Sequence, residues 1–196
     1  MRVEDLNFAF AGPRHEESLP ALFERCSTPC FCQYWHFEGN SHGWQQECAH
    51  SPSNNQEKLQ RGLHLGTAQG QGVVAEAQTQ VVGWMKLTPA KDLPKLYAQR
   101  LYRNLPCFSG KRDGIWTIGC FVIDPEWRGR KVAHALVREG VKLAKEKGAS
   151  AIESFPRRTE AAADHELWTG PHSVFERAGF EEIHTFHPYP VLRLSL

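Results

Sequence analysis

The stretch that most constrains the fold runs over residues 115–155 and combines two β-rich segments with one amphipathic helix. The first segment, IWTIGCFVID, ends at an Asp-Pro pair, and the second, AIESF, occupies residues 151–155. Between them, over residues 131–147, apolar side chains recur at helical spacing. Strand, helix and strand in this order predict a β–α–β unit within an α/β fold.

Further segments on both sides extend the predicted sheet. LNFAFAGP, FEEIHTF and VLRLSL are expected strands, and GVVAEA with VVGWMKL is an expected hairpin across QTQ. Helices are expected over HEESLPALFERC, over NNQEKLQRGLHLG after a capping Ser53, around LYAQRLY, and over HSVFERAG. Residues 26–50 are expected to be irregular. The chain therefore predicts one domain over residues 1–196, a sheet of mixed direction covered by helices.

Charge and hydropathy exclude several classes of protein. The 23 basic and 22 acidic residues give a net charge of +1, so a general nucleic-acid binder is not expected. No apolar run is long enough for a membrane span or a signal peptide, which predicts a cytoplasmic protein without a membrane partner. The six cysteines are accordingly expected to be thiols.

The loop RGRK, residues 128–131, stands between a strand and a helix that begins near Val132. A helix N-terminus presents backbone N–H groups without partners and a partial positive charge, and here three cations stand beside it. This chemistry suits a pyrophosphate, although neither a Walker sequence nor GxGxxG is present. A basic surface turn before an ordinary helix accounts equally well for the loop alone.

The surrounding motifs favour the pyrophosphate interpretation. Over residues 114–183 the chain resembles the GNAT superfamily of acyl-CoA-dependent N-acetyltransferases: Arg128 and Ala133 match the ends of its Arg/Gln-x-x-Gly-x-Gly/Ala motif, and SVFERAGF matches its later helix and Gly-Phe. CFCQYW, VGW, CFVIDPEWRGR and TGPHSVFERAGF also resemble a group of uncharacterised bacterial GNAT proteins with an early Cys-x-Cys-x-x-Trp motif.

This resemblance implies a mixed, mostly antiparallel sheet of six to seven strands flanked by helices, with a central β–α–β unit that binds acyl-CoA. It also implies transfer of an acetyl group from acetyl-CoA, as cosubstrate, to an amine by direct attack in a ternary complex. Strand backbone would contact the pantetheine arm, and loop amides would hold the pyrophosphate. The implied cofactor-binding residues are Phe121, Val122, Ile123, Arg128, Gly129, Arg130, Lys131, Val132, Ala133, His134 and Phe175.

Two positions depart from the family pattern. Lys131 replaces the middle glycine of the motif; it is expected to be harmless, on the expectation that its φ is already helical. Phe175 stands where many relatives place a tyrosine that can protonate the departing thiolate, and a phenyl ring cannot donate a proton. Another group or water is then needed for that step.

Two side chains near the expected acetyl site are candidates for catalysis. Glu153, on the strand AIESF, is the first candidate for a general base, and the alternative is that it belongs to the outward face of that strand. Cys120 precedes the coenzyme-contacting strand and is a candidate proton donor, although a buried thiol that only fills space is the more common situation. A backbone N–H from residues 121–123 is expected to hold the oxyanion.

An early segment concentrates cysteine, histidine and aromatic residues. Cys30, Cys32, Cys48 and His50 have a spacing that zinc tolerates, but buried thiols are favoured and no metal is predicted. The aromatic residues of this segment are expected to pack beside the acceptor groove, where they could form an apolar pocket or contact an amine by cation–π interaction. They are Phe31, Tyr34, Trp35, Phe37 and Trp44.

The sequence leaves the acceptor open among a small amine, an antibiotic, and a peptide or protein amino group. One rival to an enzyme is a coenzyme-A-binding sensor or interaction module without catalysis, and another is a zinc-dependent interaction protein built on CFCQYW. A homodimer is possible, and no sequence feature decides it.

Overall fold

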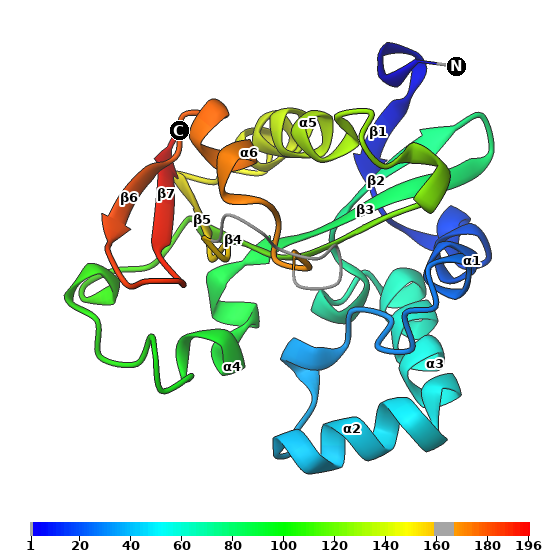
Figure 1. The fold of residues 1–196 in the computed structure, drawn as a ribbon, viewed down its shortest axis with the longest axis horizontal. Helices are drawn as coiled ribbons and strands as arrows, with labels where there is room; N and C mark the ends of the chain where they lie inside the picture. Colours follow the sequence, from blue (N-terminus) through cyan, green and yellow to red (C-terminus); the bar gives the residue numbers. More distant parts are fainter. Residues whose placement is uncertain (1, 159–166) are drawn as a thin grey trace.

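One seven-stranded sheet organises residues 2–158 and 167–196, the residues described by the computed structural model (Figure 1). Its strand order is β1-β2-β3-β4-β5-β7-β6. Neighbouring strands are antiparallel except β4 and β5, which run parallel. The predicted mixed, mostly antiparallel sheet is thereby confirmed. The strands are β1 (Asn7–Phe10), β2 (Val73–Ala77), β3 (Gln80–Pro89), β4 (Ile115–Ile123), β5 (Ala151–Ser154), β6 (Glu181–His184) and β7 (Val191–Ser195).

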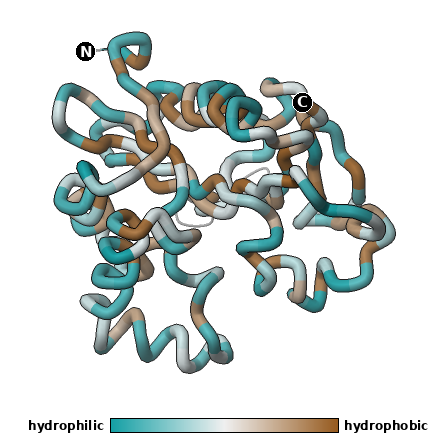
Figure 2. Tube along the Cα trace, turned by 180° about the vertical axis from the view of Figure 1, so that it is seen from behind, coloured by the Kyte–Doolittle hydropathy of each residue, from teal (hydrophilic) through white to brown (hydrophobic). Residues whose placement is uncertain are grey.

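Helices cover both faces of the sheet (Figure 1). α5 (Val132–Glu146) and α6 (His172–Arg177) lie on one face, and α1 (Ser18–Arg25) and α3 (Pro52–Leu65) pack on the other. The remaining helices are α2 (Ser41–His50), which packs on α3, and α4 (Pro94–Tyr97). Figure 2 shows hydrophobic segments along the central strands and hydrophilic segments in the outer turns. Each face of the sheet thus has its own apolar core.

α5 packs close to the sheet because its buried face includes small residues. Leu136, Val137 and Ala144 are buried, and Gly140 faces Met85 so closely that a Cβ at residue 140 would lie 2.3 Å from the methionine Cε. An alanine there could not be accommodated without a shift of the methionine. The close packing fixes the N-terminus of α5 beside the end of β4.

Three helix boundaries differ from those predicted. Residues 26–50 were expected to be irregular, but α2 forms within them and the Asn40 side chain caps it, accepting a hydrogen bond from the Gly43 amide at 2.9 Å. α2 has no buried residue, so it lacks the apolar periodicity that predicts helices. α3 begins at Pro52, before the expected cap Ser53, since proline suits the first helical position. α4 begins two residues before the expected helix around LYAQRLY and ends at Tyr97, the second residue of that segment.

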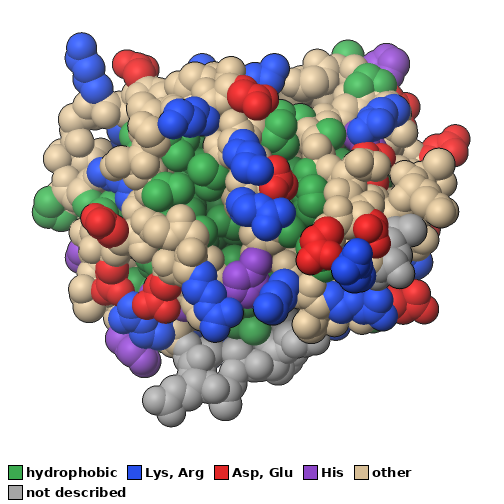
Figure 3. Space-filling view, turned by 90° about the horizontal axis from the view of Figure 1, so that it is seen from above, with side chains coloured by type: hydrophobic (Ala, Val, Ile, Leu, Met, Phe, Trp, Pro, Cys, Tyr) green, Lys and Arg blue, Asp and Glu red, His purple; other side chains and the backbone are tan. Residues whose placement is uncertain are grey.

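Surface charges are mixed on the face that carries α5. Figure 3 shows Lys and Arg side chains interspersed with Asp and Glu over its described part, with hydrophobic side chains between them. Within α5 itself, Glu139 pairs with Arg138 and Lys142. Among the helices of residues 2–158 and 167–196, none has the length and apolar character to cross a bilayer.

Candidate active site

The edge of β4 that faces β5 is only partly paired. The two strands run parallel from the pair Ile115–Ala151 to the pair Ile118–Ser154, where their pairing ends. β4 continues to Ile123 and stays paired with β3 on its other side. The pairing of the parallel strands therefore ends at Ile118, and beyond it the backbone groups on this edge of β4 have no partner on β5.

The loop from β4 to α5 contains two left-handed residues. Gly129 has φ of +71°, and Lys131, at the N-cap of α5, has φ of +66° and ψ of +21°. The expectation of a helical φ at Lys131 is therefore wrong. A left-handed conformation costs a residue with a Cβ about 1–2 kcal/mol, because the Cβ approaches the following carbonyl oxygen. The lysine keeps the backbone geometry for which glycine is the natural choice.

This loop and the start of α5 can hold an anion. The first N–H groups of α5, from Val132 onward, have no carbonyl partner within the helix, and the helix dipole adds partial positive charge. The side chains of Arg128, Arg130 and Lys131 are exposed beside them. Arg128 Nε also donates to the Ile123 carbonyl at 3.2 Å, which links the loop to β4. The donors and charges suit a pyrophosphate.

His134 lies in the first turn of α5. Burial is the largest influence on its ring and, together with the charges of Arg177 and Lys131, lowers its pKa. The shift favours the neutral ring, so the positive charge around this loop comes from Arg128, Arg130, Lys131 and the helix dipole.

The Phe121 amide, which was expected to be open to a ligand, already has a partner. It donates a hydrogen bond of 2.7 Å to the Trp168 carbonyl. Gly170 lies in the same segment, with φ of +94°, and a Cβ there would lie 2.8 Å from the Phe121 ring and 2.9 Å from the Phe175 ring. Residues 167–170 therefore lie against β4 in the region where it is no longer paired with β5.

Phe175 belongs to the core. Its side chain is fully buried, and its ring packs on Phe121 and Phe180 with centroid separations of 6.0 and 5.3 Å. Its assignment as a cofactor-binding residue stays a prediction. The ring supplies apolar surface and no proton.

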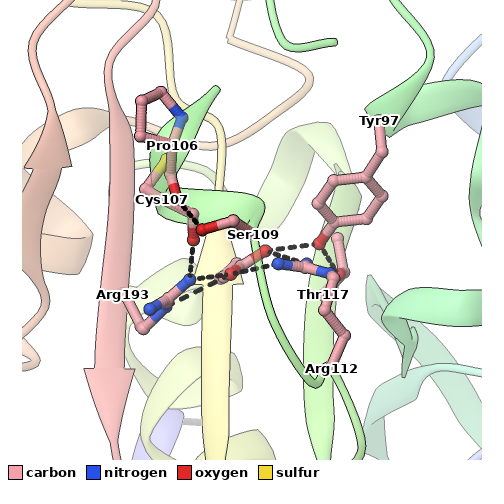
Figure 4. A network of polar contacts seen from close by, with 8 residues as sticks. Tyr97, Pro106, Cys107, Ser109, Arg112, Thr117 and Arg193 are labelled. Carbon is pink, nitrogen blue, oxygen red and sulfur yellow. Dashed lines mark hydrogen bonds and ion pairs between the residues drawn. The ribbon is translucent and has the colours of Figure 1, made fainter. Parts of the chain in front are cut away.

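Glu153 does not have the surroundings of a general base. Its carboxylate is fully buried and accepts hydrogen bonds from Arg112 Nη2 at 2.7 Å, Arg193 Nη2 at 2.6 Å and Tyr97 Oη at 2.6 Å. Figure 4 shows Arg193 on β7 and Arg112 approaching from two sides. Because both oxygens are engaged, the prediction of a base is corrected to a structural role: the carboxylate joins β5 to β7 and to the chain around Arg112.

Sequence reasoning missed the partners of this carboxylate. Tyr97 also lies within 2.5 Å of the Thr117 hydroxyl oxygen, and burial, followed by the Glu153 charge, raises the pKa of its phenol. Arg193 continues the network to the Cys107 carbonyl at 2.8 Å (Figure 4). No short motif links these positions, which come together only through the pairing of β4, β5 and β7.

Cys120 is joined to Cys32 by a disulfide. The prediction that all six cysteines are thiols is therefore wrong, and Cys120 cannot serve as a proton donor because it carries no S–H. Both cysteines are buried on the side of the sheet covered by α1 and α3. The bond attaches the loop after α1 to β4, beside the Phe121 amide.

The disulfide also removes Cys32 from the zinc arrangement that the spacing tolerated. Cys30 and Cys48 remain thiols, and burial is the first cause that raises the pKa of each. Across residues 2–158 and 167–196, no three His, Cys, Asp or Glu side chains are grouped so that they could hold a metal ion.

A cavity of about 230 Å³ adjoins the open edge of β4. We call it the aromatic pocket; its lining residues are Thr28, Cys30, Tyr34, Trp44, Cys120, Phe121, Val122 and Trp168. Of the aromatic residues expected beside an acceptor groove, Tyr34 and Trp44 line it, whereas Phe31 and Trp35 are buried in the core. The sequence feature that pointed to this pocket is the aromatic-rich segment that contains CFCQYW. No sequence feature pointed to Trp168.

Lys86 is a buried cation that sequence reasoning also missed. Its side chain is fully buried in β3, and Nζ donates to the carbonyls of Ala68 and Gln69. Burial lowers its pKa to about 7. Burial is also the largest cause that lowers the pKa of nearby His36 to about 3, and the charge of Lys86 contributes. The segment VVGWMKL predicts an ordinary strand. The burial of Lys86 becomes evident only from the packing of the residues around that strand.

Comparisons with known proteins identify a matching family and several solved structures with a similar fold. A family model described as "Acetyltransferase (GNAT) family" matches residues 15–180. The fold is similar to that of the PaiA N-acetyltransferase of Thermoplasma acidophilum in complex with coenzyme A, with 12% identity, TM-score 0.57 and coverage of 97% of this chain and 99% of that one. It is also similar to a GNAT acetyltransferase of Brucella melitensis in complex with acetyl-CoA, with 15% identity, TM-score 0.51 and coverage of 97% and 88%.

A GCN5-related N-acetyltransferase of Kribbella flavida has 19% identity and TM-score 0.51, with coverage of 98% and 99%. A search of curated proteins found no match. At these levels of identity, the similarity to the solved structures establishes the fold.

Proposed function

The chain belongs to the GNAT acetyltransferase family, and from this premise we propose that it transfers the acetyl group of acetyl-CoA to the nitrogen of an amine by direct attack in a ternary complex. The observation that carries the proposal is the unit of β4, loop and α5. β4 is no longer paired with β5 beyond Ile118, and the left-handed Gly129 and Lys131 lead directly into the N-terminus of α5. An extended arm and a pyrophosphate need this pair of features together.

In this proposal the backbone of Phe121, Val122 and Ile123 pairs with the pantetheine arm. Amides and cations from Arg128 to His134 hold the pyrophosphate, and the Phe121 amide holds the acetyl carbonyl. Binding then requires that this amide exchange the Trp168 carbonyl for the ligand. The complexes of the Thermoplasma and Brucella proteins with coenzyme A and acetyl-CoA support the choice of cosubstrate.

The chemical step needs little from side chains. The amine nitrogen attacks the thioester carbonyl carbon and the C–N bond forms. The C–S bond breaks with its electron pair on sulfur, and the proton that the nitrogen loses passes to the coenzyme A thiolate. Positioning and a backbone oxyanion donor supply most of the rate when nucleophile and carbonyl are held together. With Glu153 in ion pairs and Cys120 in a disulfide, proton transfer is assigned to water.

Calorimetric titration tests the binding part of the proposal. Acetyl-CoA is expected to bind stoichiometrically, and an acetylated pantetheine fragment without the pyrophosphate is expected to bind far more weakly. The double variant R128A/R130A should weaken binding of acetyl-CoA but not of the fragment. Equal affinity of the protein for acetyl-CoA and the fragment would contradict the assignment of the loop.

A second function, a coenzyme-A-binding module without catalysis, is favoured by two observations. The Phe121 amide is engaged by Trp168, and Phe175 offers no hydroxyl. Release of free thiol from acetyl-CoA across a panel of amines separates the two functions: an enzyme releases thiol in proportion to acetylated amine, and a sensor binds without release.

A single domain over residues 1–196, a homodimer and a cytoplasmic location stay predictions.

A further inference from the structure

The aromatic pocket lies where an acceptor would meet the acetyl group. It is lined by Cys120, Phe121 and Val122 of β4, the same strand that faces the coenzyme in the proposed function, on which this inference rests. Three of its other lining residues, Tyr34, Trp44 and Trp168, are aromatic, and the remaining two are Thr28 and Cys30. The Tyr34 ring is edge-on to Trp44 and to Trp168, with centroid separations of 5.5 and 6.1 Å. Such walls favour a flat apolar molecule.

The pocket offers no charge partner to an ammonium group. None of its described lining residues is acidic, and Cys30, whose pKa is raised chiefly by burial, lines it as a neutral thiol. A cation already stands over the Tyr34 ring: Lys95 Nζ lies 4.4 Å from the ring centroid and donates to the Phe37 carbonyl at 2.8 Å. A cationic ligand beside this ring would be repelled by the lysine.

Among the described residues, neither of the two side chains considered for deprotonating an ammonium ion is available. Glu153 gives both oxygens to Arg112, Arg193 and Tyr97, and Cys120 is oxidised. An acceptor whose nitrogen is already neutral needs no such base, because only a neutral nitrogen has the lone pair that attacks. An alkylamine is mostly protonated at neutral pH, whereas an amino group attached to an aromatic ring shares its lone pair with the ring and stays neutral.

We propose that the acceptor is an arylamine whose ring lies in the aromatic pocket and whose amino nitrogen faces the acetyl carbonyl at the edge of β4. The neutral nitrogen attacks the thioester carbonyl carbon and forms the amide C–N bond. The C–S bond breaks with its electron pair on sulfur, and the proton lost by nitrogen reaches the thiolate through water. The products are the N-acetylated arylamine and free coenzyme A.

Matched amines test this proposal. With acetyl-CoA at neutral pH, 4-methylaniline is expected to give kcat/KM at least about tenfold above 4-methylbenzylamine and cyclohexylamine, since both alkylamines are protonated and cyclohexylamine also lacks the flat ring. The rate with 4-methylbenzylamine should rise as the pH increases, and the rate with 4-methylaniline should not. A preference for either alkylamine at neutral pH would overturn the proposal.

Two variants and a control locate the acceptor. W44L should raise KM for 4-methylaniline by about fivefold or more by removing a ring wall, and W44F should restore most of the affinity. Because Trp44 is only partly buried, both variants should fold. F186L is the control: Phe186 is an exposed aromatic outside the pocket, so its replacement should leave KM unchanged.

Ligand-observed NMR with 4-methylaniline and no coenzyme separates this proposal from the proposed function. If acetyl-CoA does not bind, the proposed function fails, and binding of 4-methylaniline that W44L weakens and W44F largely restores would still support the pocket. If acetyl-CoA binds and only alkylamines are acetylated, the proposed function stands and the arylamine is overturned. Absence of 4-methylaniline binding to the wild-type protein would also overturn it.

Discussion

At the scale of single residues, Lys131 shows how a position can keep a backbone conformation while its side chain changes. Its φ of +66° suits glycine, so K131G should unfold at higher urea concentration than K131A, by about 1 kcal/mol in the free energy of unfolding. K131A is the matched control because alanine has the same left-handed cost as lysine. Equal stability of the two variants would mean that the loop is not left-handed in solution.

Lys86 should make the free energy of unfolding depend on pH. In the folded protein the pKa of Lys86 is lowered to about 7, whereas in the unfolded chain it is about 10.4. Between these values the unfolded state holds one more proton, so stability should rise with pH there, by at most about 1.4 kcal/mol per pH unit, and this gain is absent below the folded pKa. K86M should lack this rise. The difference in the free energy of unfolding between wild type and K86M therefore isolates the contribution of Lys86 from that of other titrating groups.

Denaturant unfolding at several pH values between about 7 and 9 measures this difference. K145M, which changes an exposed lysine on α5, is the control. A difference between wild type and K86M that is flat with pH would contradict the buried environment of Lys86.

Glu153 should prove structural when it is changed. E153Q leaves Arg112 and Arg193 facing a neutral amide in a buried site, so the free energy of unfolding should fall by about 3 kcal/mol. E139Q, which affects only pairs on the surface of α5, should change it by less than about 1 kcal/mol. An E153Q protein of wild-type stability that has lost turnover would instead restore the general base.

At the scale of elements, the segment 167–170 and the open edge of β4 depend on each other. G170A should destabilise the fold by about 3 kcal/mol, because the new Cβ has an unfavourable φ and meets the rings of Phe121 and Phe175. Amide exchange at Phe121 should accelerate in the same variant as its bond to Trp168 is lost. G12A, at an extended residue with no atom within 4 Å, should be near neutral.

Elements with strong periodicity were predictable, and those held by distant contacts were not. The β2–β3 hairpin and α5 follow from apolar spacing. The predicted end of the helix over NNQEKLQRGLHLG agrees with α3, which ends at Leu65 with Gly66 as its C-cap. α2 escaped prediction because it buries no residue. Glu153 was placed correctly on β5, but its role depends on Arg112 and Arg193, which reach it from far along the chain, so only the assembled sheet shows that its oxygens are engaged.

At the scale of the whole molecule, the Cys32–Cys120 disulfide links parts of the chain that are 88 residues apart. A cross-link over such a loop restricts the unfolded chain, so reduction should lower the free energy of unfolding by about 4 kcal/mol. Urea unfolding with and without dithiothreitol measures the loss, and C32S/C120S should be insensitive to the reductant. Labelling of unfolded, unreduced protein should find four thiols, at Cys26, Cys30, Cys48 and Cys107; six would contradict the bond.

The strand order has a consequence for synthesis on the ribosome. β7 follows β6 in the chain but lies between β5 and β6 in the sheet, and its Arg193 reaches Glu153. During synthesis β6 emerges before β7, the strand with which it pairs. The Glu153 carboxylate can by then pair with Arg112 but not yet with Arg193. The nascent chain therefore carries an exposed β5 edge until residues 191–195 have left the exit tunnel, and it is in this interval that a chaperone would find a strand to bind.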